Sequence, residues 1–520
     1  MPELLHHIID RSADRHPGKP AFVYGTDAVS YGDLVERANG LAHALVDDGS
    51  EPGDRIGLLM PKSLESAIAL FAALKAGGIA VPLDPQSPAD RLAGIIADAG
   101  IGRIVVRPEQ QRLIESLVGR VDSTIEMVVG LNELSTESVR SIDWQSLPTC
   151  DRTPDVGLAD SDPAYLLYTS GSTGEPKGIL HSHRSGLAYA RLSARMYSVG
   201  PADRLGNFAP LHFDQSTFEF YTGPLCGATT VLIPQALGFA TASLGELIES
   251  EQLTFWYSVP SVLIQLVLND ALVGRDLSRL RWILFGGEPF PPQHLNRLMR
   301  LLPHARFSNV YGPTETNQCT CHNIDGHAEV DKPLPIGRVW EDTEALVVDT
   351  DDQPVPEGET GELLIRSVTM MLGYWQRPDL DELATYWRKC DDQPAERFYR
   401  TGDIVRLLCD GKMEFVGRRD RQVKIRGHRV ELDEVEAVLN SHVDVAEAVA
   451  VTLLDDRENI TIDAAVVVRR GRELTEKQVA AHAAKRLPTY ARPRRIVFMD
   501  EFPRTRTDKV DRKALSDRLA

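Results

Sequence analysis

Short apolar runs alternate with helical patterns along the chain up to about residue 310. The runs lie at 54–59, 79–83, 103–106, 228–233, 253–259, 281–285 and 306–310. The apolar residues of 30–46 recur at helical spacing, and Ser30 is positioned to cap a helix there. Short buried strands that alternate with amphipathic helices are typical of parallel sheets covered by helices, so the pattern predicts an α/β fold.

The pattern changes after about residue 334, where short strands separated by turn signals predict a β-rich subdomain. Beyond residue 419 the sequence is interpreted as a separate small α+β unit. Its predicted helices and strands lie at 431–441, 446–454, 460–468, 475–487 and 494–500. A chain of 520 residues exceeds what one hydrophobic core supports, so at least two domains are expected.

The stretch Tyr165–Gly178 reads YLLYTSGSTGEPKG and has the composition of an anion-binding loop. The apolar run Tyr165–Tyr168 predicts a buried strand, and the glycines and hydroxyls after it supply N–H and O–H donors that can converge on a phosphate. Lys177 adds a mobile positive charge. The loop is not a Walker A motif, because no Gly-Lys-Ser/Thr follows and Ile179–His181 is expected to be extended. Taken alone, such a loop also suits a solvated connection. A polar stretch at about 108–160 precedes it.

The composition is that of an ordinary globular protein, but its charge limits the partners. Hydrophobic residues make up 42% and charged residues 25%, which allows a well-buried interior. The formal net charge is −18, and since nucleic acid and anionic lipid require a basic face, neither partner is expected. No apolar run reaches the roughly 20 residues of a membrane span, and the first residues lack a secretory pattern. The expected location is the cytoplasm.

Six cysteines are scattered without the rhythm of a disulfide scaffold, which suits a reducing compartment. The cluster Cys319-x-Cys321-His322, with His327 nearby, is a weak zinc candidate, because one Cys-x-Cys without a second pair is poor ligand spacing. No zinc is therefore expected.

Three further segments carry groups suited to a nucleotide. Residues 309–315 read NVYGPTE, and a Tyr-Gly-Pro turn after a strand can present an aromatic face to a purine and a carboxylate to Mg²⁺. The carboxylate of Asp403 can accept hydrogen bonds from two vicinal hydroxyls, and Arg418 can pair with a ribose or a phosphate. Lys509 stands in a polar loop, where a lone lysine is usually exposed. Each segment by itself is also an ordinary turn or loop.

Taken in order, these segments resemble a non-ribosomal peptide synthetase adenylation domain, part of the adenylate-forming superfamily that also contains acyl- and aryl-CoA ligases and firefly luciferase. The matching segments are SYGDL (30–34), LKAGGIAVPLDP (74–85), YTSGSTGEPKG (168–178), FDQS (213–216), NVYGPTE (309–315), GELLIRSVTMMLGYW (361–375), YRTGDI (399–404), GRRDRQVKIRGHRVELDEVE (417–436), LPTYARP (487–493) and TDKVDR (507–512). The resemblance implies a large N-terminal adenylation core, residues 1–419, with two helix-covered sheets and a β-rich subdomain. It also implies a small mobile α+β C-terminal domain, residues 420–520.

The resemblance also implies roles in an ATP site. The loop 169–177 would hold the β- and γ-phosphates, and Tyr311 would stack on adenine. Asp403 and Arg418 would fix the ribose, and Glu315 would bind Mg²⁺. The implied ATP-binding residues are Thr169, Ser170, Gly171, Ser172, Thr173, Gly174, Lys177, Gly287, Tyr311, Gly312, Thr314, Asp403 and Arg418.

Two lysines would serve successive half-reactions, as the resemblance implies. Lys509 would bridge the substrate carboxylate and a ribose oxygen during adenylate formation. Rotation of the small domain about a hinge at Asp420 would then bring the segment around Lys424 to the site for thioester formation. The chain carries Thr507-Asp508-Lys509 where relatives usually have Asn-Gly-Lys, so a carboxylate next to Lys509 can hold it in an ion pair.

The substrate is expected to be an amino acid, because Asp214 of the FDQS motif matches the aspartate that pairs with the substrate ammonium group in relatives. The implied pocket lining is Gln215, Phe218, Tyr257, Leu284, Gly286, Val310, Gln318 and Cys319. The lining holds no second charge, and Phe218 and Tyr257 are bulky. We therefore expect a small or medium neutral α-amino acid: alanine or proline first, then glycine, serine or valine.

A carrier protein in trans is the expected partner. The sequence ends eight residues past Arg512 with no carrier module, which resembles a free-standing enzyme of natural-product biosynthesis. The basic stretches 417–429 and 485–495 suit an acidic carrier, and equally suit solvated faces with ATP contacts. An acyl- or aryl-CoA ligase is the alternative function, and a non-catalytic ligand-binding relative is the third.

Overall fold

The chain divides into two compact units. The first contains Met1–Pro85, Ala99–Leu167 and Gly178–Arg419, and the second contains Gln86–Asp98, Tyr168–Lys177 and Asp420–Ala520. The computed structural model describes the chain except residues 1–2, 121, 137, 172–174, 326–328, 391–392, 456–459, 505–509 and 520, and it describes only the backbone of 239, 325, 390 and 393.

A nine-stranded sheet of the first unit has the order β16-β15-β14-β13-β12-β10-β11-β1-β2. Its strands are β1 (Pro20–Tyr24), β2 (Asp27–Ser30), β10 (Arg204–Asn207), β11 (Thr229–Leu232), β12 (Phe255–Ser258), β13 (Trp282–Gly286), β14 (Arg306–Tyr311), β15 (Thr320–Asp325) and β16 (Arg338–Val339). The pairs from β1 through β14 are parallel, whereas β2, β15 and β16 join antiparallel at the two ends. The predicted parallel sheet is confirmed.

An eight-stranded sheet of the same unit has the order β19-β9-β8-β4-β3-β5-β6-β7. Its strands are β3 (Arg55–Leu59), β4 (Ile79–Leu83), β5 (Arg103–Val106), β6 (Met127–Val129), β7 (Arg140–Ile142), β8 (Pro163–Thr169), β9 (Lys177–Ser182) and β19 (Gly373–Tyr374). The polar stretch 108–160 therefore contains two short strands of this sheet, β6 and β7. It also contains helix α5 (Gln111–Val118).

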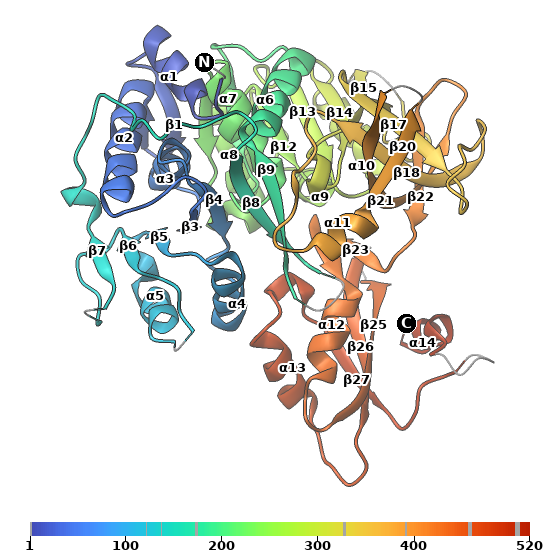
Figure 1. Ribbon diagram of the computed structural model, residues 1–520. Helices are drawn as coiled ribbons and strands as arrows, with labels where there is room; N and C mark the ends of the chain where they lie inside the picture. Colours follow the sequence, from blue (N-terminus) through green and yellow to red (C-terminus); the bar gives the residue numbers. More distant parts are fainter. Residues whose placement is uncertain are drawn as a thin grey trace. The chain divides into compact units, whose positions relative to one another are not determined.

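Helices α2 (Tyr31–Asp47) and α3 (Leu64–Lys75) share one hydrophobic core with both sheets (Figure 1). The core joins Phe22 of β1 to Leu58 of β3 through Leu41 and Phe71 of these helices. Every residue of α3 from Ser66 onward is buried, because apolar neighbours surround the helix. Ser30 accepts from the amide of Asp33 and caps α2, as predicted.

Alternate residues of the central strands face opposite sides of the nine-stranded sheet. Trp256, Ile283 and Phe285 pack against α8 (Thr241–Ser250), α9 (Pro260–Leu268) and α10 (Pro292–Leu301). Their neighbours Tyr257 and Leu284 pack instead against α6 (His183–Tyr197). Since side chains alternate along a strand, the sheet separates its structural side from the side of the predicted pocket.

The β-rich part of the first unit is a five-stranded sheet, with order β17-β18-β21-β20 and with β22 paired to β21. Its strands are β17 (Thr343–Val348), β18 (Thr360–Ser367), β20 (Thr385–Cys390), β21 (Gln393–Leu407) and β22 (Met413–Arg418). Shorter α-helices elsewhere in the chain are α1 (His7–Arg15), α4 (Ala89–Ala99), α7 (Gly223–Leu225) and α11 (Pro378–Ala384). Residues Phe218–Thr222 form a π-helix. The 3₁₀ turns are Pro108–Gln110, Trp144–Ser146, Asp214–Ser216, Gln235–Phe239, Thr314–Thr316 and Thr489–Ala491.

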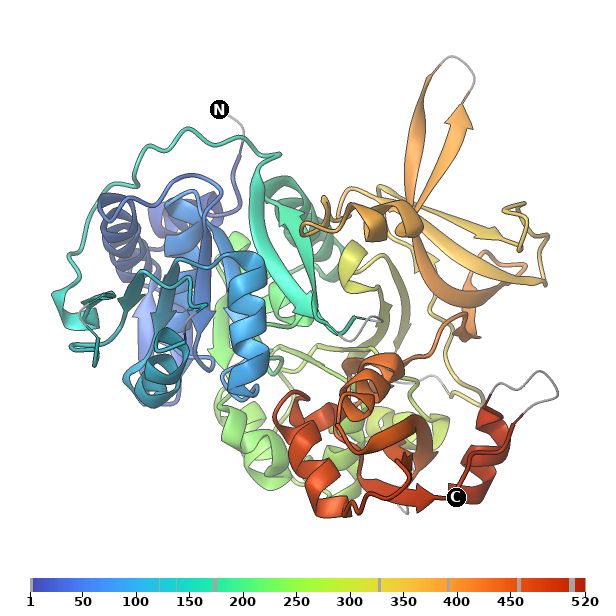
Figure 2. The ribbon, with the colours of Figure 1, turned by 60° about the horizontal axis from the view of Figure 1, so that its bottom comes forward.

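The second unit is built on a three-stranded sheet and a hairpin (Figure 1, and Figure 2 from a second side). The sheet has the order β25 (Val445–Leu454), β26 (Ile460–Val468) and β27 (Arg495–Met499), and the hairpin pairs β23 (Gln422–Ile425) with β24 (His428–Glu431). Ala448 and Ala450 face α12 (Leu432–Asn440) and α13 (Glu476–Ala484), whereas Val449 and Val451 face α14 (Arg512–Leu519). This alternation matches the predicted α+β pattern.

Among the described residues, none of the helices is long and apolar enough to cross a membrane. Within that same part of the chain, no group of three or more His, Cys, Asp or Glu side chains is arranged to hold a metal ion.

Candidate active site

The three predicted adenosine residues of the first unit lie together. Asp403 of β21 stands directly opposite Arg418 of β22, and the guanidinium Nη1 donates to its Oδ1 at 2.5 Å. The hydroxyl of Tyr311, at the end of β14, donates to Oδ2 of the same carboxylate. Burial, and then the charge of Asp403, hold the pKa of Tyr311 well above its usual value, so the phenol stays protonated. The cluster offers an aromatic ring, a carboxylate and a guanidinium in one place.

Glu315 is fully buried in the turn that follows Tyr311. The hydroxyl of Tyr374 donates to its Oε1 at 2.7 Å. His181 lies beside it, with Nε2 at 2.9 Å from the carbonyl oxygen of Thr314. Burial lowers the pKa of His181 to about 4, so the imidazole is neutral at pH 7. Tyr374 was not among the predicted site residues, although it belongs to the matching GYW segment.

Four of the predicted pocket residues form one buried cluster beside α6. Phe218, Tyr257, Leu284 and Val310 each have 5% or less of their surface exposed. The ring of Phe218 meets that of Tyr257 edge to face at 6.0 Å, and Tyr257 is paired with Leu284 across β12 and β13. The register of three parallel strands therefore brings together residues that are far apart in the sequence.

The polar residues of the predicted pocket surround Tyr257. Asp214 is half-buried, and its charge acts on Tyr257, whose pKa is raised first by burial and then by this carboxylate. Gln215 contacts the same phenol, and the Nε2 of Gln318 donates to its hydroxyl at 2.5 Å. Two amides thus contact one buried hydroxyl, on which the charge of Asp214 also acts.

Close backbone approach explains two of the predicted glycines. A Cβ at Gly286 would lie 2.2 Å from the carbonyl oxygen of Val310, and one at Gly312 would lie 1.9 Å from that of Asn317. Neither position can hold a side chain without moving the backbone. Gly287 has φ +88, a conformation that glycine adopts readily. Cys319, another predicted pocket residue, donates its amide to the carbonyl of Tyr311 at 3.0 Å.

The described part of the phosphate loop belongs to the second unit. Among the residues that the structure describes, the buried Oγ1 of Thr169 has no hydrogen-bond partner. A Cβ at Gly171 would lie 2.1 Å from the carbonyl oxygen of Glu175, so the loop is tightly folded there. Lys177 begins β9, and the predicted residues Ser172, Thr173 and Gly174 lie outside the described residues.

Lys424 lies on a hairpin that contacts this loop. Lys424 is paired with Arg429 across β23 and β24, and the hydroxyl of Ser170 donates to the carbonyl of Arg429 at 2.9 Å. Asp420 begins the last segment of the second unit, and its Oδ1 accepts from the amide of Gln422 at 3.1 Å. Lys509 lies outside the described residues.

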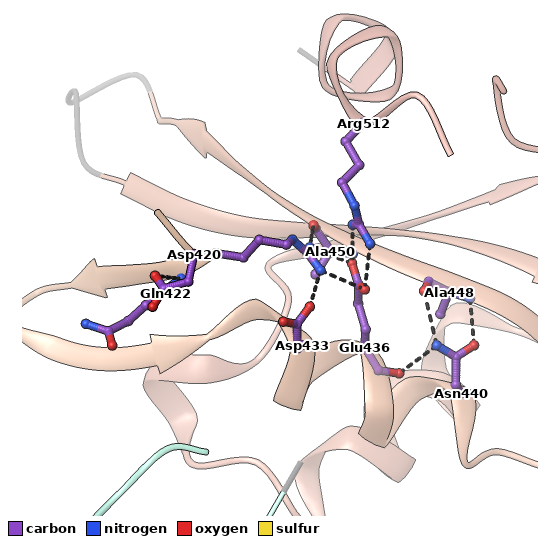
Figure 3. Close-up of polar contacts among 9 residues, drawn as sticks. Asp420, Gln422, Asp433, Glu436, Asn440, Ala448, Ala450 and Arg512 are labelled. Carbon is purple, nitrogen blue, oxygen red and sulfur yellow. Dashed lines mark hydrogen bonds and ion pairs between the residues drawn. The ribbon is translucent and has the colours of Figure 1, made fainter. Parts of the chain in front are cut away.

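Glu436 ties together distant parts of the second unit (Figure 3). Its carboxylate accepts from both terminal nitrogens of Arg512, at 2.5 and 3.0 Å, and from both of Arg421, at 3.0 and 2.7 Å. It also accepts from the amide of Ala450 at 2.7 Å. Arg421 belongs to the basic stretch 417–429, which the sequence suggested for docking a carrier. In the structure its guanidinium is paired with Glu436. The sequence analysis missed this cluster, since each residue separately is an ordinary surface charge.

One turn further along α12, Asn440 also binds the backbone of β25. Its amide accepts from the N–H of Ala448 at 2.8 Å and donates to the carbonyl of that residue at 3.2 Å (Figure 3). The Nη2 of Arg421 likewise donates to the carbonyl of Ala450 at 3.1 Å. Since β25 ends the order of its sheet in the part of the chain that the structure describes, these side chains cover the outer backbone groups of an edge strand.

Comparison with known proteins identifies the family. Residues 9–375 match the AMP-binding enzyme family, and residues 434–509 match the AMP-binding enzyme C-terminal domain. The chain therefore belongs to the AMP-binding enzyme family, and the resemblance to the adenylate-forming superfamily is confirmed.

Two curated relatives are similar over their whole length. The chain is 36% identical over 516 residues to an L-proline--[L-prolyl-carrier protein] ligase of Pseudomonas fluorescens, with 99% of each chain covered. It is 35% identical over 528 residues to an enzyme of the same name from Streptomyces coelicolor, with 99% of this chain and 96% of the relative covered.

Two solved structures share the fold. The amide bond synthetase McbA from Marinactinospora thermotolerans has 26% identity and a TM-score of 0.86, covering 99% of this chain and 100% of its own. The Vibrio cholerae adenylation domain AlmE, solved with glycyl-adenosine-5'-phosphate, has 25% identity and a TM-score of 0.84, covering 99% and 97%. The predicted α/β fold, with a large N-terminal and a small C-terminal domain, is that of these structures.

Proposed function

We propose that this chain uses ATP to convert a small neutral α-amino acid into an aminoacyl adenylate and transfers the aminoacyl group to the phosphopantetheine thiol of a separate carrier protein. Alanine and proline are the first choices, and the names of the two full-length relatives put proline ahead. The proposed carrier docks in trans, and the proposed pathway class is natural-product biosynthesis.

The placement of Asp214 is the observation that carries the proposal. Its carboxylate is half-buried, and its charge acts on the buried phenol of Tyr257 among apolar neighbours. A carboxylate partly withdrawn from water favours a cationic ligand, because a nearby positive charge stabilises its ionised form. The ammonium group of an amino acid supplies that cation, whereas a fatty or aromatic acid supplies none.

The nucleotide chemistry follows from the other groups. Tyr311 would stack on adenine, Asp403 would accept from the ribose hydroxyls, and the orphan hydroxyl of Thr169 suits a phosphate oxygen. Mg²⁺, which prefers carboxylate and phosphate oxygens, fits the buried carboxylate of Glu315 and would neutralise phosphate charge when bound. These residues bind and orient; each well-placed donor or cation contributes about 2–4 kcal/mol to a charged transition state.

The reaction has two steps in this proposal. The substrate carboxylate attacks the α-phosphorus of ATP, an O–P bond forms, the bond to the β-phosphate oxygen breaks, and pyrophosphate leaves. In the second step the carrier thiol attacks the acyl carbon and gives up its proton to solvent, a C–S bond forms, the bond from the acyl carbon to the phosphate oxygen breaks, and AMP leaves. Lys509 is proposed to serve the first step and Lys424 the second, with Asp420 as the hinge between them.

Exchange of labelled pyrophosphate into ATP tests the proposal. The assay runs over a panel of amino, fatty and aromatic acids, followed by transfer to a phosphopantetheinylated carrier. Exchange that depends on a small neutral amino acid supports the proposal. Exchange with fatty or aromatic acids alone would favour the acyl- or aryl-CoA ligase, and exchange with no acid would favour a non-catalytic relative.

A further inference from the structure

An unpaired amide lies among the residues of the candidate pocket. Gln318 is only 5% exposed. Its Nε2 donates to the hydroxyl of Tyr257 at 2.5 Å, and its Oε1 is buried with no hydrogen-bond partner in the described part of the chain. Rotation of the amide by 180° would exchange the two atoms and would still leave one of them unpaired. Buried polar atoms without a partner are rare in folded proteins, so this one calls for an explanation.

Gln318 is held firmly in place. Its neighbour Cys319 donates its amide to the carbonyl of Tyr311 at 3.0 Å, which ties the segment to the end of β14. Its other neighbour, Asn317, donates from Nδ2 to the hydroxyl of Thr217 at 3.2 Å. These contacts hold the residues on both sides of Gln318, and the hydrogen bond to Tyr257 holds its amide.

Tyr257 links Gln318 to the proposed amine site. The hydroxyl of Tyr257 accepts from the amide of Gln318, and the charge of Asp214 acts on the same phenol. An amino acid whose ammonium group pairs with Asp214 would extend its side chain toward this hydroxyl and this amide.

The rest of the lining makes the amide chemically distinct. Phe218, Leu284 and Val310 are apolar and buried, and they offer a substrate only van der Waals contact. A wholly apolar side chain packed here would leave the amide of Gln318 unpaired. A site built to hydrogen-bond a substrate hydroxyl rejects the analogue that lacks it, because a buried polar group of the protein is then left without a partner.

We propose that Gln318 determines specificity and that the preferred substrate is a small neutral α-amino acid bearing a hydroxyl group, as serine, threonine and hydroxyproline do. The inference rests on the proposed function and, within its class of small neutral α-amino acids, ranks the hydroxylated members ahead of alanine and proline. The hydroxyl donates to Oε1 of Gln318, and since a hydroxyl both donates and accepts, it completes the amide in either orientation.

Matched pairs of amino acids test the inference in the full-length enzyme. The pairs are alanine and serine, valine and threonine, and proline and 4-hydroxyproline, compared by kcat/KM in ATP–pyrophosphate exchange. In the pair with the highest activity, the hydroxylated member is expected to exceed its partner by roughly ten-fold or more. Gln318→Met keeps the length of the side chain and removes the amide, so the ratio is expected to fall to about one or below. Gln293→Met, at an exposed glutamine of α10, is the control and keeps the wild-type ratio.

Each outcome of this comparison either supports or overturns the inference on Gln318. Equal use of both members by the wild type, or preference for the apolar member, would overturn the inference and leave the proposed function standing. An unchanged ratio in Gln318→Met would overturn it as well. If that variant does not fold, the wild-type comparison alone decides. Absence of exchange with every amino acid would remove the proposed function and this inference with it.

Discussion

Replacing Glu436 by glutamine is expected to loosen the second unit at the edge of β25. The substitution keeps the size of the side chain and removes the charge that two arginines share. The amide of Ala450 donates to this carboxylate at 2.7 Å, and both guanidiniums bind it through two nitrogens. The perturbation therefore acts on an identified backbone amide as well as on two ion pairs.

The magnitude follows from the burial of the three side chains. Removing one partner of a buried ion pair typically costs about 3–5 kcal/mol. Glu436 is 13% exposed, but Arg421 is 27% and Arg512 39% exposed, so the stranded guanidiniums keep part of their hydration. Solvent screening reduces the expected loss to about 2–3 kcal/mol. Since 1.4 kcal/mol is a factor of ten, the opening equilibrium at Ala450 should rise about 30- to 150-fold.

Hydrogen exchange measures this opening directly, with peptides that cover Val445–Leu454. The matched control is Glu447→Gln on the same strand, where the carboxylate pairs with Arg504 and the side chains are 36% and 42% exposed. An exposed pair of this kind contributes about 0–1 kcal/mol, so exchange should rise less than about fivefold. A rise below fivefold in Glu436→Gln, or equal rises in the two variants, would refute the reasoning.

The same contacts predict a pH dependence. Burial opposes ionisation of Glu436, but hydrogen bonds from Arg512, Arg421 and the amide of Ala450 outweigh it, and its pKa lies below the ordinary value. A carboxyl whose pKa is lowered by folding stabilises the protein above its unfolded pKa of about 4.3 and loses that contribution as the pH falls. The difference between wild type and Glu436→Gln should therefore be full at pH 7 and shrink in acid.

Three further substitutions test the proposed site. Lys424→Ala should spare pyrophosphate exchange and slow carrier loading at least about tenfold, whereas Lys509→Ala should abolish exchange; equal loss of both steps in both variants would contradict these roles. Asp214→Asn should lower kcat/KM for the amino acid by about 100-fold or more and leave the KM for ATP nearly unchanged, and a raised KM for ATP instead would argue against an amine partner. Tyr374→Phe removes a hydrogen bond to buried Glu315 and should slow exchange about fivefold or more, so a rate within twofold of wild type would show that other groups hold the carboxylate.

Much of the fold was predictable because buried positions recur with a regular spacing in the sequence of a helix or a strand. The run at 79–83 became β4 over the same residues, and the pattern at 30–46 became α2. The stretch 108–160 was not recognised as part of a sheet. Its strands β6 and β7 have three residues each, too short for a period of two to stand out.

The site was predictable in its members and not in its geometry. Tyr311 and Asp403 are 92 positions apart, and only the family resemblance joined them before the sheets of the first unit brought them into contact. The run 417–429 looked basic because the sequence shows arginines without their partners. Arg418 is paired with Asp403 and Arg421 with Glu436, contacts that depend on strand register and helix phase.

The covered edge of β25 has a consequence for recombining this enzyme with its relatives. Arg421 and Arg512 hold the carboxylate of Glu436 that covers the amide of Ala450, so a change at one of these three positions alters the contacts of the others. A chimera whose junction falls between Arg421 and Arg512 would combine a carboxylate from one parent with a guanidinium placed by another. Crossovers before Arg421 or after Arg512 keep these three positions in one parent, and they are where grafted segments should tolerate foreign partners.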